Sequence, residues 1–257
     1  MKPISRIVLT IVLLGATAIF GCGRKGLLMP PEALVPAAVQ DLNVRQSGEE
    51  FRITWSAPAK EQGGRPLRDL SEFKLLRRSI TGDGSDCPSC PDSWQLLTTV
   101  DLDMPGETGQ SGATFSYRDK GLPLGSTSQY RLLAISRSGG VSSPAISPVK
   151  KLQPLVTPPS LKAAVLPAAI RLEFSFAPAG NAKLVGFNVY RRANEKTPAL
   201  LPLNSVPIGQ SFWEDRQLEF GHTYRYSAAA LVELEGETVE SLPSKEVELL
   251  FTLQELR

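Results

Sequence analysis

The chain repeats one order of residues, and this repetition constrains its fold more than any other feature. Five residues recur at a constant spacing of 96 positions: Asp119, Gly125, Thr127, Tyr130 and Ala134 return as Asp215, Gly221, Thr223, Tyr226 and Ala230. The segment Phe73–Arg78 likewise returns as Phe187–Arg192. Internal repetition of this kind indicates two copies of one structural unit. The sequence therefore predicts two similar domains in tandem.

Apolar and polar residues alternate over short runs in both copies. In Phe51–Trp55 the odd positions are apolar and the even positions are polar, and Tyr130–Ala134 follows a similar period. A period of two is typical of a half-buried strand, and Gly, Pro, Ser and Asp bound these runs at intervals of roughly 8 to 12 residues. No segment after Cys22 carries a helical stripe of useful length. We expect an all-β chain of two β-sandwiches, although the period alone does not separate a sandwich from a barrel.

Several of these positions resemble those of fibronectin type III modules. Such modules carry an aromatic residue on the second strand and a Gly-x-x-Tyr corner before the sixth, and this chain has Trp55, Phe174 and the run Gly221–Tyr226 at those places. The resemblance covers about residues 36–252 and implies two fibronectin type III-like domains. It also implies that the following aromatic residues mark the cores: Trp55, Phe174, Tyr130, Tyr224 and Tyr226. In the first copy Ser128 stands where the corner tyrosine is expected.

The first 22 residues have the pattern of an export signal. Lys2 and Arg6 precede an apolar run over 7–20, which is too short to span a bilayer comfortably. The run ends in Ile19–Cys22, which resembles the lipobox of bacterial lipoproteins, with Phe20 in place of the usual small residue. The resemblance implies that residues 1–21 are a signal peptide and that Cys22 carries fatty acids such as palmitate, which hold the protein on a membrane. An ordinary secretory signal or an uncleaved anchor is the alternative.

Two stretches rich in proline divide the remaining chain. Residues 22–36 show no periodicity and contain Pro30, Pro31 and Pro36, which indicates a lipidated tether. Residues 152–159 contain three further prolines, which favour a short and stiff linker. We therefore expect the first fibronectin type III-like domain over 37–151 and the second over 160–257, held end to end.

The charge of the chain gives no indication of a nucleic-acid partner. The full sequence has 28 Lys and Arg against 26 Asp and Glu, but removal of the signal peptide takes away Lys2 and Arg6 and leaves the two totals equal. Proteins that bind nucleic acids present a basic face, often with aromatic residues between the charges. The sequence shows neither, so we expect no nucleic-acid partner.

The two cysteines after Cys22 lie close together, as Cys87 and Cys90, in a loop rich in Gly, Asp and Ser. A local disulfide is the default in an oxidising compartment, because lipidation of Cys22 leaves an even number. A redox-active pair is a second hypothesis, although no thioredoxin-like βαβ pattern surrounds the motif. A zinc half-site is a third, and it needs two more ligands from a chain with one histidine.

Candidates for catalysis are few. The single histidine, His222, lies at a predicted turn, and no Gly-x-Ser-x-Gly elbow occurs. The acidic residues Asp101, Asp103 and Glu107 lack the ligand spacing of a calcium loop. We therefore expect no enzyme, no cofactor and no metal site.

Two further groups of charged residues have structural interpretations. Glu233, Glu235 and Glu237 alternate across a predicted hairpin turn, which a solvated strand face explains. The Arg pairs at 77–78 and 191–192 end equivalent strands, so a structural cause common to both copies is favoured over an anion site.

The tether has a resemblance of its own. The run Cys22–Pro31 is similar to the start of the short lipoproteins that assist maturation of the lipopolysaccharide translocon, with Leu27 in place of a proline. This similarity and Gly23 after the cysteine favour the outer membrane of a two-membrane envelope, on its periplasmic face. We expect a non-catalytic envelope lipoprotein that acts as a spacer or binds an unidentified envelope protein or glycan. The alternatives are an accessory subunit of an envelope enzyme or polysaccharide system and a redox-active CxxC protein.

Overall fold

The computed structural model describes residues 30–82, 90, 93–104, 108–193, 201–204 and 206–252. This part of the chain contains a short 3-10 turn, η2 (Pro31–Leu34), and strands. The strands of the first module are β1 (Asn43–Ser47), β2 (Glu50–Ser56), β3 (Leu70–Ile80), β4 (Gln95–Asp101), β5 (Gly109–Ser111), β6 (Thr114–Asp119), β7 (Thr127–Ser136), β8 (Ala145–Ile146) and β9 (Lys150–Lys151). Those of the second are β10 (Ser160–Leu166), β11 (Ala169–Ser175), β12 (Lys183–Ala193), β13 (Phe212–Asp215), β14 (Thr223–Leu234), β15 (Glu237–Glu240) and β16 (Val247–Leu250).

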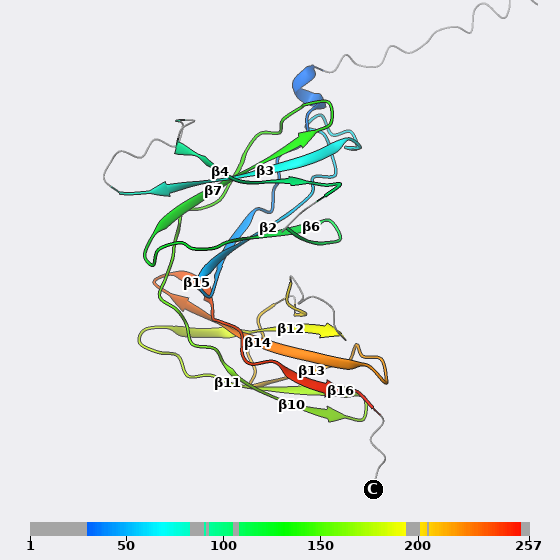
Figure 1. The fold of residues 1–257 in the computed structure, drawn as a ribbon, viewed down its shortest axis with the longest axis vertical. Helices are drawn as coiled ribbons and strands as arrows, with labels where there is room; N and C mark the ends of the chain where they lie inside the picture. The colour runs from blue at the N-terminus through cyan, green and yellow to red at the C-terminus, as the bar shows by residue number, and fades with distance from the viewer. Residues whose placement is uncertain are drawn as a thin grey trace, which may run out of the picture.

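The predicted fold class is confirmed: the chain is all-β and consists of two tandem sandwiches of the fibronectin type III-like kind. Figure 1 shows the first module, coloured blue to green, next to the second, coloured green to red, along the long axis of the molecule. Among the described residues we find no helix with the length and hydropathy of a membrane span.

The core of the first module lies between two sheets, β1-β2-β6-β5 and β4-β3-β7-β8, with β9 also paired to β7. Burial alternates along β2, as the sequence predicted, so that Phe51, Ile53 and Trp55 face the core. Trp55 stacks on Phe115 of β6 with ring centroids 5.8 Å apart, and it meets Phe73 of the opposite sheet edge-on at 5.7 Å. These aromatic contacts join the two layers.

The second module repeats this arrangement with the sheet β10-β11-β13 against β12, β14 and β16. Phe174 of β11 stacks on Phe187 of β12 with ring centroids 4.7 Å apart.

A carboxylate at the end of one strand connects the layers in both modules. Asp119 accepts hydrogen bonds from Tyr130 and Arg77 at 2.8 Å and 2.9 Å.

In the second module Asp215 accepts the equivalent bonds from Tyr226 and Arg191, at 2.8 Å and 2.6 Å. The repeated Arg, Asp and Tyr positions therefore form one buried polar group per module. Burial raises the pKa of the Tyr226 hydroxyl, and the neighbouring Asp215 carboxylate raises it further, so this tyrosine stays neutral. The first arginine of each repeated pair has a structural role, in agreement with the interpretation from the sequence.

The corner of the second module has the expected bond, because the backbone N–H of Glu219 donates to the hydroxyl of Tyr224 at 2.9 Å. In the first module Ser128 occupies that position and is buried. Residues before the expected start of the first domain at 37 also contact this domain. The N–H groups of Gly63 and Gln62 donate to the carbonyls of Ala33 and Val35.

The two modules share a sheet. Strand β15 of the second module pairs in parallel with β1 of the first, which makes one eight-stranded sheet in the order β12-β14-β15-β1-β2-β6-β5, with β16 on β14. The linker is also fixed, because Gln46 donates to the carbonyl of Gln153 at 2.9 Å and accepts from its N–H at 2.8 Å. The prolines predict a stiff linker. The pairing of β15 with β1 adds a second constraint between the two modules, and the sequence did not predict it.

Candidate functional site

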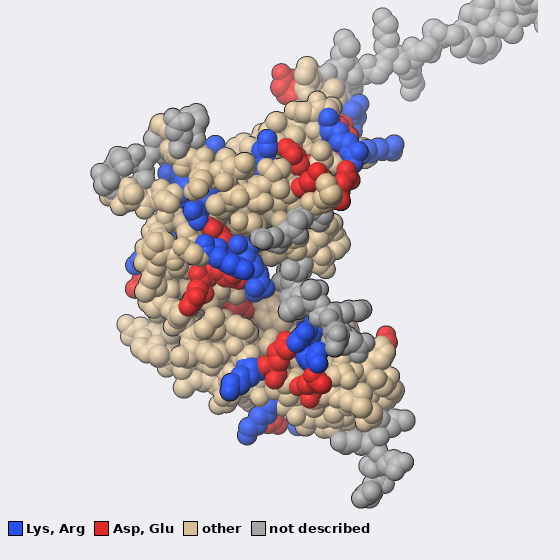
Figure 2. All heavy atoms as spheres, in the orientation of Figure 1, with Lys and Arg blue, Asp and Glu red and all other residues tan. Residues whose placement is uncertain are grey.

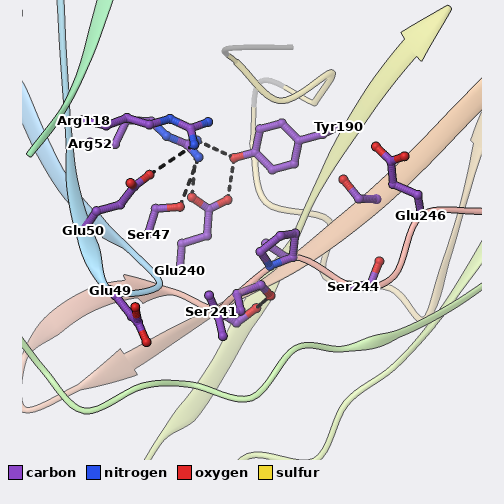
Figure 3. A pocket seen from close by; sticks show the side chains of 14 residues that line it. Ser47, Glu49, Glu50, Arg52, Arg118, Tyr190, Glu240, Ser241, Ser244 and Glu246 are labelled. Atoms are coloured by element: carbon purple, nitrogen blue, oxygen red, sulfur yellow. Dashed lines mark hydrogen bonds and ion pairs between the residues drawn. The ribbon is translucent and has the colours of Figure 1, made fainter. Parts of the chain in front are cut away.

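The most distinctive polar site lies where the shared sheet passes from one module to the other. Glu240, at the end of β15, has a side chain that is 2% exposed. Its carboxylate accepts a hydrogen bond from the hydroxyl of Tyr190 at 2.5 Å and one from Asn188 at 3.1 Å, both on β12. Its other oxygen lies 3.5 Å from a guanidinium nitrogen of Arg52, on β2 of the first module. A buried carboxylate therefore joins the two modules (Figure 3).

Arg52 is held from both sides. Its guanidinium donates to the Tyr190 hydroxyl at 2.8 Å and to the Ser47 hydroxyl at 3.0 Å, and it lies over the Tyr190 ring at 5.4 Å. Burial lowers the pKa of Arg52, but Tyr190 and Glu240 more than offset this effect, so the net pKa is raised. Burial raises the pKa of Tyr190 to about 12, with Glu240 adding to the rise and Arg52 opposing it. The site at neutral pH is therefore a cation, an anion and a neutral phenol.

Local strand geometry explains why these side chains meet. The period of two on β2 places Phe51 and Ile53 in the core and Arg52 on the outer face of the sheet. The turn between β1 and β2 requires a positive φ of 61° at Gly48, and the N–H of Gly48 donates to the carbonyl of Glu240 at 2.9 Å. Because the sheet continues through β15, its outer face carries Arg52 from one module beside Tyr190 from the other.

Two further ion pairs, one half-buried and one exposed, add to the junction. Lys150 and Lys151 of β9 lie 2.5 Å and 3.4 Å from carboxylate oxygens of Glu237 and Glu235, at the tip of the β14–β15 hairpin. The interpretation of this hairpin as a solvated strand face was therefore incomplete, because two of its acids contact the first module. Pairs with this exposure contribute little individually, about 0–1 kcal/mol each.

A cleft with a volume of about 420 Å³ opens beside the buried cluster. It is lined by Arg52, Arg118, Glu50 and Tyr190, and by the segment 241–244 that follows β15. Arg118 lies 3.3 Å from Glu50 at its rim. Figure 2 shows acidic and basic side chains gathered side by side at this level of the molecule. Arg52 and Arg118 are paired with acidic residues of the lining, while the carboxylate of Glu49 is exposed at the cleft.

The five aromatic residues predicted to mark the cores are all buried: Trp55, Phe174, Tyr130, Tyr224 and Tyr226. Cys22 and Cys87 lie outside the described residues, whereas Cys90 lies within them. The lipid on Cys22 and the disulfide between Cys87 and Cys90 accordingly stay predictions.

The residues considered for catalysis lie apart from the junction. His222 has a side chain that is 42% exposed, and its Nδ1 lies 3.6 Å from a carboxylate oxygen of Glu219. Asp103 pairs with Arg137 at 2.9 Å, and its N–H donates to Asp101, while residue 107 is outside the described part. Over the described ranges, no group of three or more His, Cys, Asp or Glu side chains is placed to hold a metal ion.

Sequence reasoning missed Arg52, Tyr190 and Glu240. The signal that could have found them is the hairpin around Glu235-Gly236, which is longer in the second copy than in the first. Its additional length forms β15, the strand that pairs with β1.

Comparison with known proteins gives similarity at the level of structure alone. No family model and no curated protein sequence matches the chain. Among solved structures, the chain is similar to the FN1–FN3 domains of chicken CNTN1, with 14% identity and a TM-score of 0.34 over 91% of this chain and 75% of that one. It is also similar to the twitchin kinase region from C. elegans, with 17% identity and a TM-score of 0.32 over 47% of this chain and 17% of that one. Identities this low say nothing of function.

Proposed function

We propose that this chain is a lipid-anchored envelope protein whose two modules form one rigid, non-catalytic arm that spaces or binds another envelope component. The observation that supports rigidity is the shared sheet, in which β15 pairs with β1 and Glu240 is buried against Arg52. Modules joined only by a linker move relative to each other, whereas a continuous sheet with a buried ion pair favours one arrangement.

The proposed anchor lies at a suitable end of this arm. The turn η2, which begins the described chain, lies at the end of the first module that is far from the second (Figure 1). A lipid on Cys22, eight positions before Pro30, would therefore attach the arm by its tip, with the second module farthest from the attachment point. Two or three acyl chains make such an attachment lasting, since each buried CH₂ contributes about 0.8 kcal/mol.

Distance measurements between the modules test the rigidity. Spin labels introduced through an unnatural amino acid at Lys74 on β3 and Lys162 on β10 leave all three cysteines as they are. Double electron–electron resonance should give a single narrow distance distribution. The variant Glu240→Ala should broaden it, and the matched variant Glu248→Ala, at an exposed pair of the second module, should not. A broad distribution in the unaltered chain would refute the rigid arm.

Lipid labelling tests the anchor separately. The unaltered chain should incorporate labelled palmitate and sediment with membranes, whereas Cys22→Ala should lose the label. Cys87→Ala is the matched control and should keep it. A Cys22→Ala protein that retained the label would remove the lipoprotein assignment, and the proposed outer-membrane location would fall with it.

The non-catalytic part of the proposal has its own support. Arg52 is paired with Glu240 and Arg118 with Glu50, so these charged groups of the cleft are held by one another. Cys87 and Cys90 would serve this arm as a structural disulfide. Thiol titration of the unreduced protein should find no free thiol, and two free thiols would favour the redox alternative instead.

A further inference from the structure

We propose that the module junction binds an extended peptide segment of a partner protein, in which an aliphatic side chain stands next to a basic one. This inference rests on the binding role proposed above and assigns that role a position. The site is a groove with a volume of about 460 Å³ that shares Glu49 with the cleft described above. It is lined by Gly121, Leu122 and Leu124 of the loop after β6, by Leu152, Gln153 and Leu155 of the linker, and by Glu49.

The groove has an apolar surface that the fold of the module does not use. The side chains of Leu124 and Leu155 are 67% and 49% exposed, on two segments that meet at the junction. Leu152, deeper in the groove, is only 4% exposed and belongs to the core. An aliphatic side chain of a partner would therefore rest on a fixed floor with two exposed leucines beside it, which is the usual construction of an anchor pocket.

The second module fills the equivalent corner with aromatic rings. The N–H of Gly125 donates to the carbonyl of Leu152 in the first module, and the N–H of Gly221 donates to the carbonyl of Phe251 in the second. Phe220, the counterpart of Leu124, stacks on Phe251 with ring centroids 4.7 Å apart. Two large rings thus cover each other in one copy, whereas leucines occupy both positions in the other and leave space between them.

The exposed acid beside the groove determines the second feature of the proposed peptide, its basic side chain. Glu49 is exposed, has no partner among the described residues, and lines both the groove and the polar cleft. Figure 3 shows Glu49 pointing away from the Arg52 and Glu240 cluster. Three of the acidic residues that line the cleft are each paired with an arginine: Glu50 with Arg118, Glu240 with Arg52 and Glu246 with Arg192. A basic side chain following the aliphatic anchor would therefore meet the exposed carboxylate of Glu49.

The site depends on the junction being closed. Glu49 stands in the turn whose Gly48 is bonded to Glu240, and the linker that carries Leu155 is held at Gln153. Leu152 and Gln153 are held by the first module, whereas Leu155 precedes Val156, which packs with Val232 and Val239 of the second module. Separation of the modules would therefore move Leu155 relative to Glu49. The complete groove, with Leu155 beside Glu49, therefore requires the closed junction.

Nuclear magnetic resonance titration of the full mature chain in detergent micelles tests the proposal. The probe is the blocked peptide Gly-Leu-Leu-Lys-Arg-Gly, and its two controls replace Lys-Arg by Glu-Glu or Leu-Leu by Ser-Ser. We expect the probe to shift the amide signals of Glu49, Leu124 and Leu155, and both controls to bind at least about tenfold more weakly.

Matched variants locate the binding on the protein. Leu124→Ser and Glu49→Gln should each weaken binding of the probe at least about fivefold. Leu96→Ser, at a residue of β4 that is 51% exposed, and Glu248→Gln should leave it unchanged. Equal binding of all three peptides, shifts confined to other residues, or no effect of Leu124→Ser would overturn the proposal.

Three further results distinguish the alternatives. Sedimentation that showed a dimer sensitive to Leu124→Ser would make the groove an interface between copies of this chain and would also overturn the proposal. A narrow distance distribution between the modules together with no peptide binding would reject this site while leaving the rigid arm intact. A broad distribution would reject the arm itself.

Discussion

Replacement of Glu240 by Gln should destabilise the protein by about 3 kcal/mol, because it removes one charge from a buried pair and leaves the other in place. The side chain of Glu240 is 2% exposed and that of Arg52 is 15% exposed. Glutamine keeps the shape and one acceptor oxygen, so the change is almost entirely one of charge. Arg52 would then stay at the junction with its hydrogen bonds to Tyr190 and Ser47 but without an anion.

The magnitude follows from the contacts that remain. Removing one partner of a buried ion pair costs about 3–5 kcal/mol, because the remaining charge is left uncompensated. Three features favour the lower end here. Arg52 keeps two neutral hydrogen bonds, its distance to Glu240 is long at 3.5 Å, and the cleft beside it admits water. The loss of charge assistance in the bond from Tyr190 works in the opposite direction and contributes about 1 kcal/mol.

Guanidinium unfolding of the purified protein in detergent, followed by tryptophan fluorescence, measures this loss. Glu248→Gln is the matched control, since its partner Arg225 belongs to the same module and Glu248 is 53% exposed. It should cost less than about 0.5 kcal/mol. A loss below about 1 kcal/mol for Glu240→Gln would refute the view that the buried cluster holds the modules together.

Three further changes have outcomes fixed by the structure. Tyr190→Phe should cost about 1.5–3 kcal/mol at pH 8. Folding raises the pKa of Tyr190 from 10.0 to about 12, so the hydroxyl contributes fully to stability below pH 10 and loses this contribution as the pH rises through 12. The difference in stability between the two proteins should therefore shrink between pH 10 and pH 12 in alkaline denaturation curves. Gly48→Ala and Gly112→Ala should both lower the melting temperature, because both positions have a positive φ. The added Cβ at Gly48 would also lie 2.7 Å from the flexible end of the Leu242 side chain, which can move, so the two shifts should be similar; an unchanged melting temperature for either variant would contradict the strain argument. Asp215→Asn should cost about 3 kcal/mol in calorimetry by leaving a paired arginine and tyrosine without their carboxylate, and a neutral result would contradict the role assigned to the repeated polar group.

The strands and the cores could be predicted because each depends on residues close in the sequence. Alternation from Phe51 to Trp55 has one physical explanation, a strand with one buried face, and the structure confirms it along β2. Alternation alone does not show which strands of the two modules are equivalent, whereas the repeat does. Tyr130 and Tyr226 lie 96 positions apart and make the same hydrogen bond, each to the Asp eleven residues before it.

The junction could not be predicted by the same reasoning. An outward-facing residue such as Arg52 or Glu240 produces the same alternation whether it meets water or another module. Its partner is set by how a hairpin of one copy docks on a strand of the other, over a separation of nearly two hundred residues. Local periodicity carries no information about such a contact between modules. The sequence therefore predicts a solvated strand face for the acids of this hairpin, although two of them contact the first module.

The polar character of the junction explains how it can fix an orientation. Apolar contacts tolerate small sliding and rotation, since their energy depends mainly on the area removed from water. A buried carboxylate is more demanding, because any displacement that separates Glu240 from Tyr190, Asn188 and Arg52 leaves charged groups without partners. The cluster adds little net stability when formed but makes every alternative arrangement expensive. A fixed placement of the second module on the first, which the proposed rigid arm requires, follows from that property rather than from additional stability.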